Sequence, residues 1–107
     1  MNNEKTKKNN YTKFIIEGNL TGETIINKNK TIARGQIGWN SEETSCFASY
    51  EIRGAELLGK IKGKLTKGAW VRLEGSIRQD RWEYEGENYN KIVFVAFKVE
   101  FLAERNS

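Results

Sequence analysis

The chain has 107 residues, of which 37% are hydrophobic and 30% are charged, with a formal net charge of +4. This length suits one domain with one modest core and excludes a pair of full domains. The composition is typical of a soluble globular domain, and the moderate positive charge favours anionic partners such as nucleic acids.

Histidine and paired cysteines, which many catalytic and metal sites use, are missing from this sequence. It contains no histidine, and Cys46 is its single cysteine. Histidine is the commonest general base and metal ligand, and a structural zinc site needs about four ligands. We therefore expect neither an enzyme nor a bound metal or other cofactor. A lone cysteine favours a cytoplasmic location, and no apolar run approaches the roughly 20 residues of a membrane span.

The chain begins with a polar, basic stretch, MNNEKTKKNN, which predicts a disordered arm over residues 1–11. The predicted domain covers residues 12–103 and is followed by a short tail at residues 104–107. Its first strand is YTKFIIEGNL, which ends in turn residues. The next segment, ETIINKNKTIARGQIGWN, predicts two strand pieces around the turn-rich residues 27–30.

A third strand and a helix follow. In TSCFASYEIRG, alternation predicts that Cys46 and Tyr50 point to the core, whereas Phe47 and Glu51 point to the solvated face. AELLGKIKGKLTKG has leucine and isoleucine residues at spacings of three and four, which predicts a helix. Its two internal glycines weaken that helix, so we expect a short one.

The last two strands form a long hairpin. AWVRLEGSIRQDRW alternates again, Gly86 marks the hairpin tip, and KIVFVAFKVEFL is the return strand. Short antiparallel strands need closure to avoid an exposed edge. The order of elements predicts an all-β, five-stranded OB-fold barrel with Greek-key topology and one short helix between strands 3 and 4.

Several aromatic side chains occupy positions that core packing does not explain. Strand parity places Phe47 and Trp82 on the solvated face. Tyr84 and Tyr89 accompany Trp82 in the hairpin, where the three rings either stiffen the hairpin as a cross-strand cluster or bind a ligand. Single-stranded nucleic acids are held by bases stacked on aromatic rings within a groove of positive charge. The pattern is typical of such a site.

Two tryptophans are less simple to place. Counted from Ile37, Trp39 faces the core, and only a bulge near Gly38 or the end of the strand turns it outward. Trp70 faces outward beside Arg72, where it suits a contact with another subunit or with a protein partner.

Two segments resemble the bacterial single-stranded DNA-binding proteins. These are FIIEGNLTGE, with its Gly-Asn-Leu turn, and KGAWVRLEGSIRQDRW, whose spacing from Lys67 to Trp82 is the more specific signal. The resemblance runs from about Lys13 to Leu102. It implies an OB-fold that binds single-stranded DNA without sequence preference in DNA replication, recombination and repair, by base stacking and phosphate contacts and without catalysis.

The resemblance also assigns positions. Trp82 matches a base-stacking aromatic of the family directly, Phe47 falls where the family has tryptophan, and Trp39 aligns with a third position across a shorter hairpin. A further family aromatic falls at Arg53, so a charge or cation–π contact replaces a stack there. The full set of predicted DNA-binding residues is Trp39, Phe47, Arg53, Arg72, Arg78, Arg81, Trp82, Tyr84, Tyr89 and Lys91, with Trp70 at a partner or subunit interface.

The end of the sequence suggests an alternative. The family carries a flexible linker and an acidic tip that recruits other enzymes, whereas this sequence stops at FLAERNS. It thus resembles the short primosomal relatives, which act as accessory subunits. The alternative function is an accessory subunit of a primase, polymerase or helicase, encoded for example on a mobile element, that binds DNA mainly in that complex. We expect a homo-oligomer or such a replication partner, and no membrane.

Two further functions remain open at this point. RNA is a possible ligand, since stacking does not read the 2′-hydroxyl group. A nuclease is another, because carboxylates in the hairpin are potential Mg²⁺ ligands, although a charge-balanced solvated hairpin is the simpler interpretation. The carboxylates concerned are Asp80, Glu83, Glu85 and Glu87.

Overall fold

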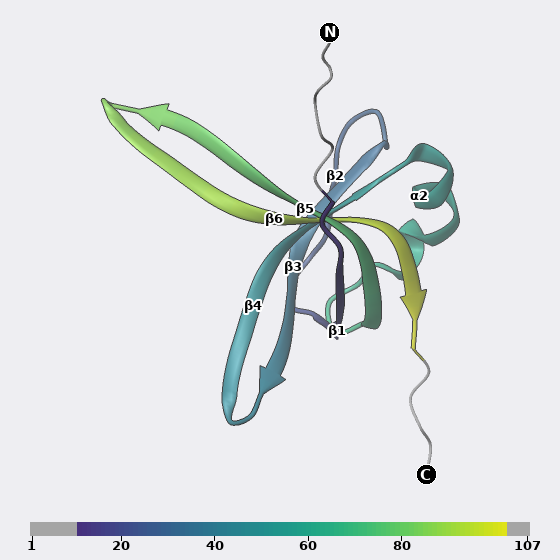
Figure 1. Ribbon diagram of the computed structural model, residues 1–107. Helices are drawn as coiled ribbons and strands as arrows, with labels where there is room; N and C mark the ends of the chain where they lie inside the picture. The colour runs from purple at the N-terminus through teal and green to yellow at the C-terminus, as the bar shows by residue number, and fades with distance from the viewer. Residues whose placement is uncertain (1–10, 103–107) are drawn as a thin grey trace, which may run out of the picture.

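The computed structural model describes residues 11–102 (Figure 1). The predicted arm, apart from Tyr11, and the predicted tail lie outside the described residues, so the domain bounds stay a prediction. The strands are β1 (Phe14–Leu20), β2 (Ile25–Ile26), β3 (Ile32–Ser41), β4 (Thr44–Arg53), β5 (Trp70–Tyr84) and β6 (Glu87–Phe101). The α-helix α2 (Ala55–Ile61) continues into the 3₁₀-helix η1 (Lys62–Lys64).

The strands close into a barrel. They pair in the order β1-β5-β6-β4-β3-β2, and β3 also pairs with β1. The pairings that close the barrel span few residues. Strands β1 and β3 are antiparallel where Leu20 pairs with Ile37, and β4 and β6 are parallel where Tyr50 pairs with Phe94. This confirms the predicted five-stranded barrel with one short helix, and the second predicted strand indeed comes in two pieces, β2 and β3.

The core lies inside the ring and is built from the inward residues of alternating strands. Leu20, Ile37, Tyr50, Ile52 and Leu73 are each no more than 1% exposed. Helix α2 adds Leu58 and Ile61 to this cluster, and Leu65 follows from the segment after η1. The apolar spacing of three and four therefore marks the face of the helix that packs on the barrel. No described helix is long and apolar enough to cross a membrane.

Two hairpins, β3–β4 and β5–β6, extend away from the barrel (Figure 1). The molecule measures 59 Å along its longest axis and 33 and 32 Å along the others. The pairing of β5 with β6 shifts register between Glu74 and Gly75, and a side chain at Gly75 would collide with the carbonyl of Val95. This bulge bends the sheet, so one pair of strands serves both the barrel wall and the projecting hairpin.

Candidate nucleic-acid interface

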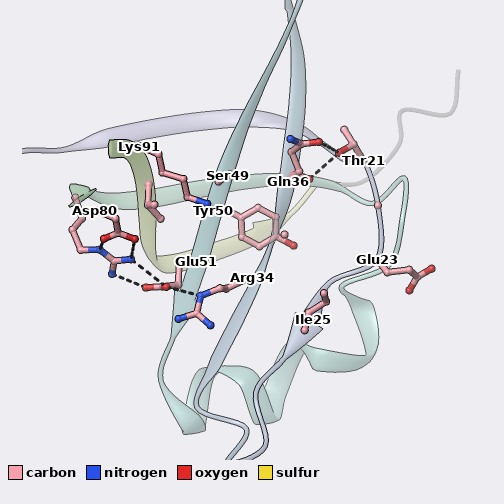
Figure 2. A pocket seen from close by; sticks show the side chains of 14 residues that line it. Thr21, Glu23, Ile25, Arg34, Gln36, Ser49, Tyr50, Glu51, Asp80 and Lys91 are labelled. Carbon is pink, nitrogen blue, oxygen red and sulfur yellow. Dashed lines mark hydrogen bonds and ion pairs between the residues drawn. The ribbon is translucent and has the colours of Figure 1, made fainter. Parts of the chain in front are cut away.

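Strand register brings two rows of side chains to one face. On β4, Phe47 lies on the same side as Ser49 and Glu51, while on β5 Trp82 lies on the same side as Asp80. Between these rows lies a hollow of about 370 Å³, shown in Figure 2. We call it the central basin; its polar lining includes Arg34, Gln36, Ser49, Glu51, Arg78, Asp80 and Lys91.

The two predicted stacking rings flank this basin. Phe47 is 59% exposed and stands two residues before Ser49, whereas Trp82 is 47% exposed and stands two residues beyond Asp80. Ser49 and Asp80 both line the basin. Each exposed ring therefore stands one same-side step along its strand from a residue of the basin, Phe47 on the β3–β4 hairpin and Trp82 on the β5–β6 hairpin.

Trp82 is paired within its own hairpin. Its ring stacks on that of Tyr89, with 5.8 Å between ring centroids and 18° between ring planes. Tyr84, one step further along the same face, is 60% exposed. The cross-strand cluster expected from the sequence is thus formed at least by Trp82 and Tyr89, and its outer surfaces are still open to solvent.

A second hollow, of about 410 Å³, lies beside the first, and we call it the aromatic hollow. Phe47, Trp39 and Trp70 all line it, and Thr21 lines both hollows. The register of β3 runs through Gly38 without a bulge, so Trp39 keeps the core-facing side and packs partly buried against the core. Trp70 was predicted to face a partner or another subunit, and it lies in the same hollow as Phe47.

The basin contains a buried carboxylate that the sequence placed on the solvated face. Glu51 is 1% exposed, and that expectation was wrong because arginines from three strands cover it. Arg34 Nε donates to its Oε2 at 2.9 Å, Arg53 Nε donates to Oε1 at 2.8 Å, and Arg78 Nη1 donates to Oε1 at 2.8 Å. The hydrogen bonds from Arg78 above all, against the opposing effect of burial, lower the pKa of Glu51 to about 2.

Arg78 is held from two sides. Besides Glu51 it contacts Asp80, with Nε to Oδ1 at 2.7 Å and Nη2 to Oδ2 at 3.1 Å. The hydrogen bond to Asp80 raises the pKa of Arg78, and the same bond lowers the pKa of Asp80. The basin lining is consequently charge-balanced rather than strongly basic: its cations are Arg34, Arg78 and Lys91, and its carboxylates are Glu23, Glu51 and Asp80.

Two of the predicted DNA-binding arginines lie elsewhere. Arg72 donates from Nε to Glu17 at 2.8 Å and from Nη1 to Glu100 at 3.2 Å, and it lines neither hollow. Arg81 has the opposite strand parity to Trp82 and donates to Gln79 at 2.9 Å. Arg72 has the strand parity of Trp70 and Trp82, and its partner Glu17 lines the aromatic hollow, whereas Arg81 points to the opposite side. The predicted role of both arginines in binding stays a prediction.

The sequence analysis did not single out Arg34, and it did not predict that Glu51 is buried beneath arginine side chains. Arg34 alternates with the inward Ala33 and Gly35, so its outward direction was readable from the sequence. Its pairing with Glu51 depends on the register between β3 and β4, which no local pattern reports. Within residues 11–102 there is no group of three or more cysteine, aspartate or glutamate residues placed to hold a metal ion.

Comparison with known proteins gives two kinds of similarity. No family model matches the chain. A single-stranded DNA-binding protein of Treponema pallidum is 43% identical over 42 residues, which are 39% of this chain and 24% of that protein. The match thus spans about a quarter of the relative's length.

Solved structures show the same fold over most of the chain. A mitochondrial single-stranded DNA-binding protein from S. cerevisiae has a TM-score of 0.74 at 15% identity, covering 87% of this chain and 96% of its own. A Plasmodium falciparum protein of this type, solved with single-stranded DNA, has a TM-score of 0.73 at 14% identity and covers 91% and 99%. A small Streptomyces coelicolor protein scores 0.64 at 15% identity and covers 83% and 92%.

Proposed function

We propose that this chain binds single-stranded DNA without sequence preference. The similarities above support its assignment to the OB-fold family of single-stranded DNA-binding proteins, and the proposal starts from that assignment. Bases stack on Phe47 and Trp82, and phosphates contact the arginines of the central basin. The observation that carries the proposal is that two exposed rings, 59% and 47% accessible, each stand two residues along a strand from the lining of one polar basin.

The physical reason is the cost of leaving aromatic rings in water. A buried aromatic ring brings a large hydrophobic gain, so an exposed one on an ordered strand suits a ligand with a flat apolar surface. Each stacked base contributes roughly 1–3 kcal/mol, and every base has such a surface, which explains tolerance of sequence. The proposed setting is DNA replication, recombination and repair in the cytoplasm, with the chain acting as a homo-oligomer.

Removing either ring tests the proposal. Phe47→Ala and Trp82→Ala are each expected to weaken binding to oligo-dT by roughly 1–3 kcal/mol, measured by fluorescence anisotropy. Phe97→Ala is the matched control, because its ring is also 59% exposed but lines a different hollow, with Tyr11. Wild-type affinity in both of the first two variants would rule out these rings as stacking platforms.

A second function has one observation in its favour. Trp70 is 37% exposed in the aromatic hollow, and tryptophan is a frequent anchor at protein interfaces. In this alternative the chain is an accessory subunit of a primase, polymerase or helicase. Oligo-dT would then bind the isolated chain weakly and the reconstituted complex tightly, whereas strong binding by the isolated chain favours the first proposal.

A further inference from the structure

The Glu51 cluster differs from an ordinary surface salt bridge because its carboxylate is buried. We use this name for Glu51 with Arg34, Arg53, Arg78 and Asp80. The carboxylate of Glu51 is 1% exposed, yet its three arginine partners are 60%, 46% and 34% exposed. The anion is thus buried beneath its cations, and the guanidinium groups form the outer layer that faces the basin and its rim.

Two of these arginines retain unused donors. Arg34 and Arg53 each reach Glu51 through Nε, and within residues 11–102 these are the hydrogen bonds that their guanidinium groups make. Both Nη groups of each residue therefore make no hydrogen bond to the described part of the chain. A pair of guanidinium N–H groups in a fixed fork matches two oxygens of a phosphate.

The net charge of the cluster matches the charge of a single phosphodiester. Three arginines face the two carboxylates of Glu51 and Asp80, which leaves one positive charge. A phosphodiester carries one negative charge. Arg34, Glu51, Arg78 and Asp80 of the cluster line the basin, and Phe47 and Trp82 each stand two residues from a basin residue, so the cluster is within reach of a strand that stacks on either ring.

We propose that Glu51 is a positioning residue whose buried carboxylate holds Arg34, Arg53 and Arg78 as a clamp for one phosphodiester of the bound strand. This rests on the proposed function and adds to it a definite phosphate subsite. An arginine side chain has many rotamers, and fixing it in water costs conformational entropy. Because Glu51 fixes these side chains in the free protein, the strand does not have to order them on binding.

The test uses Glu51→Gln, for which two mechanisms predict opposite results. Removal of a negative charge from a DNA-binding face, by net charge alone, strengthens binding. Loss of the positioning carboxylate instead weakens binding to oligo-dT by roughly tenfold. The matched control is Glu56→Gln, which makes the same charge change at an exposed position on α2. Glu51→Asp, which keeps the charge, is expected to recover part of the affinity.

Salt dependence separates positioning from damage to the fold. The slope of log K against log salt is expected to become shallower by roughly 0.7 in Glu51→Gln, the value for one phosphate of a single strand, and to stay unchanged in Glu56→Gln. Thermal unfolding establishes that each variant is folded at the temperature of the titration. Affinity and slope in Glu51→Gln equal to those of Glu56→Gln would overturn the proposal.

A chemical substitution in the DNA identifies the contacted group. A single uncharged methylphosphonate linkage, moved stepwise along oligo-dT, is expected to weaken wild-type binding at one position and to have no further effect on Glu51→Gln there. Equal losses in both proteins at every position would contradict a clamp built on Glu51. Absence of oligo-dT binding by the wild-type protein would instead defeat the proposed function itself, so the two failures are distinguishable.

Discussion

At the scale of the residue, Glu51 shows how a charged group is kept inside a small protein. Burial of an isolated carboxylate is costly, and charged hydrogen bonds offset that cost. Here four N–H···O contacts from three arginines converge on one carboxylate. The group therefore stays ionised throughout the neutral range, with a pKa of about 2.

The pH dependence of stability follows from this pKa. Glu51 titrates at about 2 in the folded chain against an ordinary value of 4.5, so the folded state favours the ionised form. Its stabilisation is complete above pH 4.5 and is lost as the pH falls toward 2. The loss is at most about 3 kcal/mol, because solvent around the exposed arginines screens part of the interaction.

Chemical denaturation at a series of pH values measures this effect. The difference in unfolding free energy between the wild-type protein and Glu51→Gln is expected to shrink between pH 5 and pH 2.5. The pKa of Asp80 is also lowered, by Arg78, so Asp80→Asn reports its separate contribution. A wild-type-to-Gln difference that is the same at both pH values would contradict the assignment to Glu51.

At the scale of the element, the β5–β6 hairpin presents Trp82, Tyr84 and Tyr89 beyond the barrel wall. Its tip is formed by Glu85 and Gly86, which have φ angles of 51° and 80°. Two successive positive φ angles are what a type I′ turn requires, and this turn matches the twist of the flanking strands. The tip thus keeps the strands paired up to Tyr84 and Glu87.

A substitution at the tip is expected to loosen the rings that the hairpin carries. Gly86→Ala places a side chain at a positive φ and is expected to destabilise the hairpin by about 1 kcal/mol. Hydrogen exchange of the hairpin amides accelerates, and oligo-dT binding weakens. Gly59→Ala is the contrasting control: it lies within α2, nothing lies within 4 Å of the added Cβ, and it is expected to stabilise the chain. Wild-type exchange rates in Gly86→Ala would contradict this account.

At the scale of the whole molecule, closure of the barrel sets two independent hairpins on one binding face. Phe47 belongs to β3–β4 and Trp82 to β5–β6, with the central basin between them. A strand long enough to reach both rings gains from each of them, whereas a very short strand occupies one at a time.

Oligonucleotide length tests this arrangement. On an oligo-dT of about 16 nucleotides, the affinity losses of Phe47→Ala and Trp82→Ala are expected to add in the double variant. On an oligo-dT of about four nucleotides, either single substitution is expected to change affinity little, because the strand still stacks on the remaining ring, and the double variant is expected to lose most of the affinity. Anisotropy titrations with both lengths measure the difference. Non-additive losses on the long oligonucleotide would mean that the rings do not lie along one strand path.

Much of this molecule follows from local sequence pattern. Alternation along the strands determined that Phe47 and Trp82 leave the core and that Trp39 stays on the core side, because side-chain direction in a strand is a local property. The spacing of Leu58 and Ile61 determined the buried face of the short helix, and Leu65, which continues the pattern, lies after its end. Strand order and the need for closed edges were sufficient for the barrel.

Other features were decided only by the tertiary structure. Arg34 and Arg78 lie 17 and 27 positions away from Glu51 in the chain, and only barrel closure and register bring them onto it. The same long-range pairing brought Arg72 to Glu17 and Glu100, and it placed Trp70 and Phe47 in the lining of one hollow. A sequence determines which way each side chain points from its own strand, but which side chains meet depends on how distant strands pair.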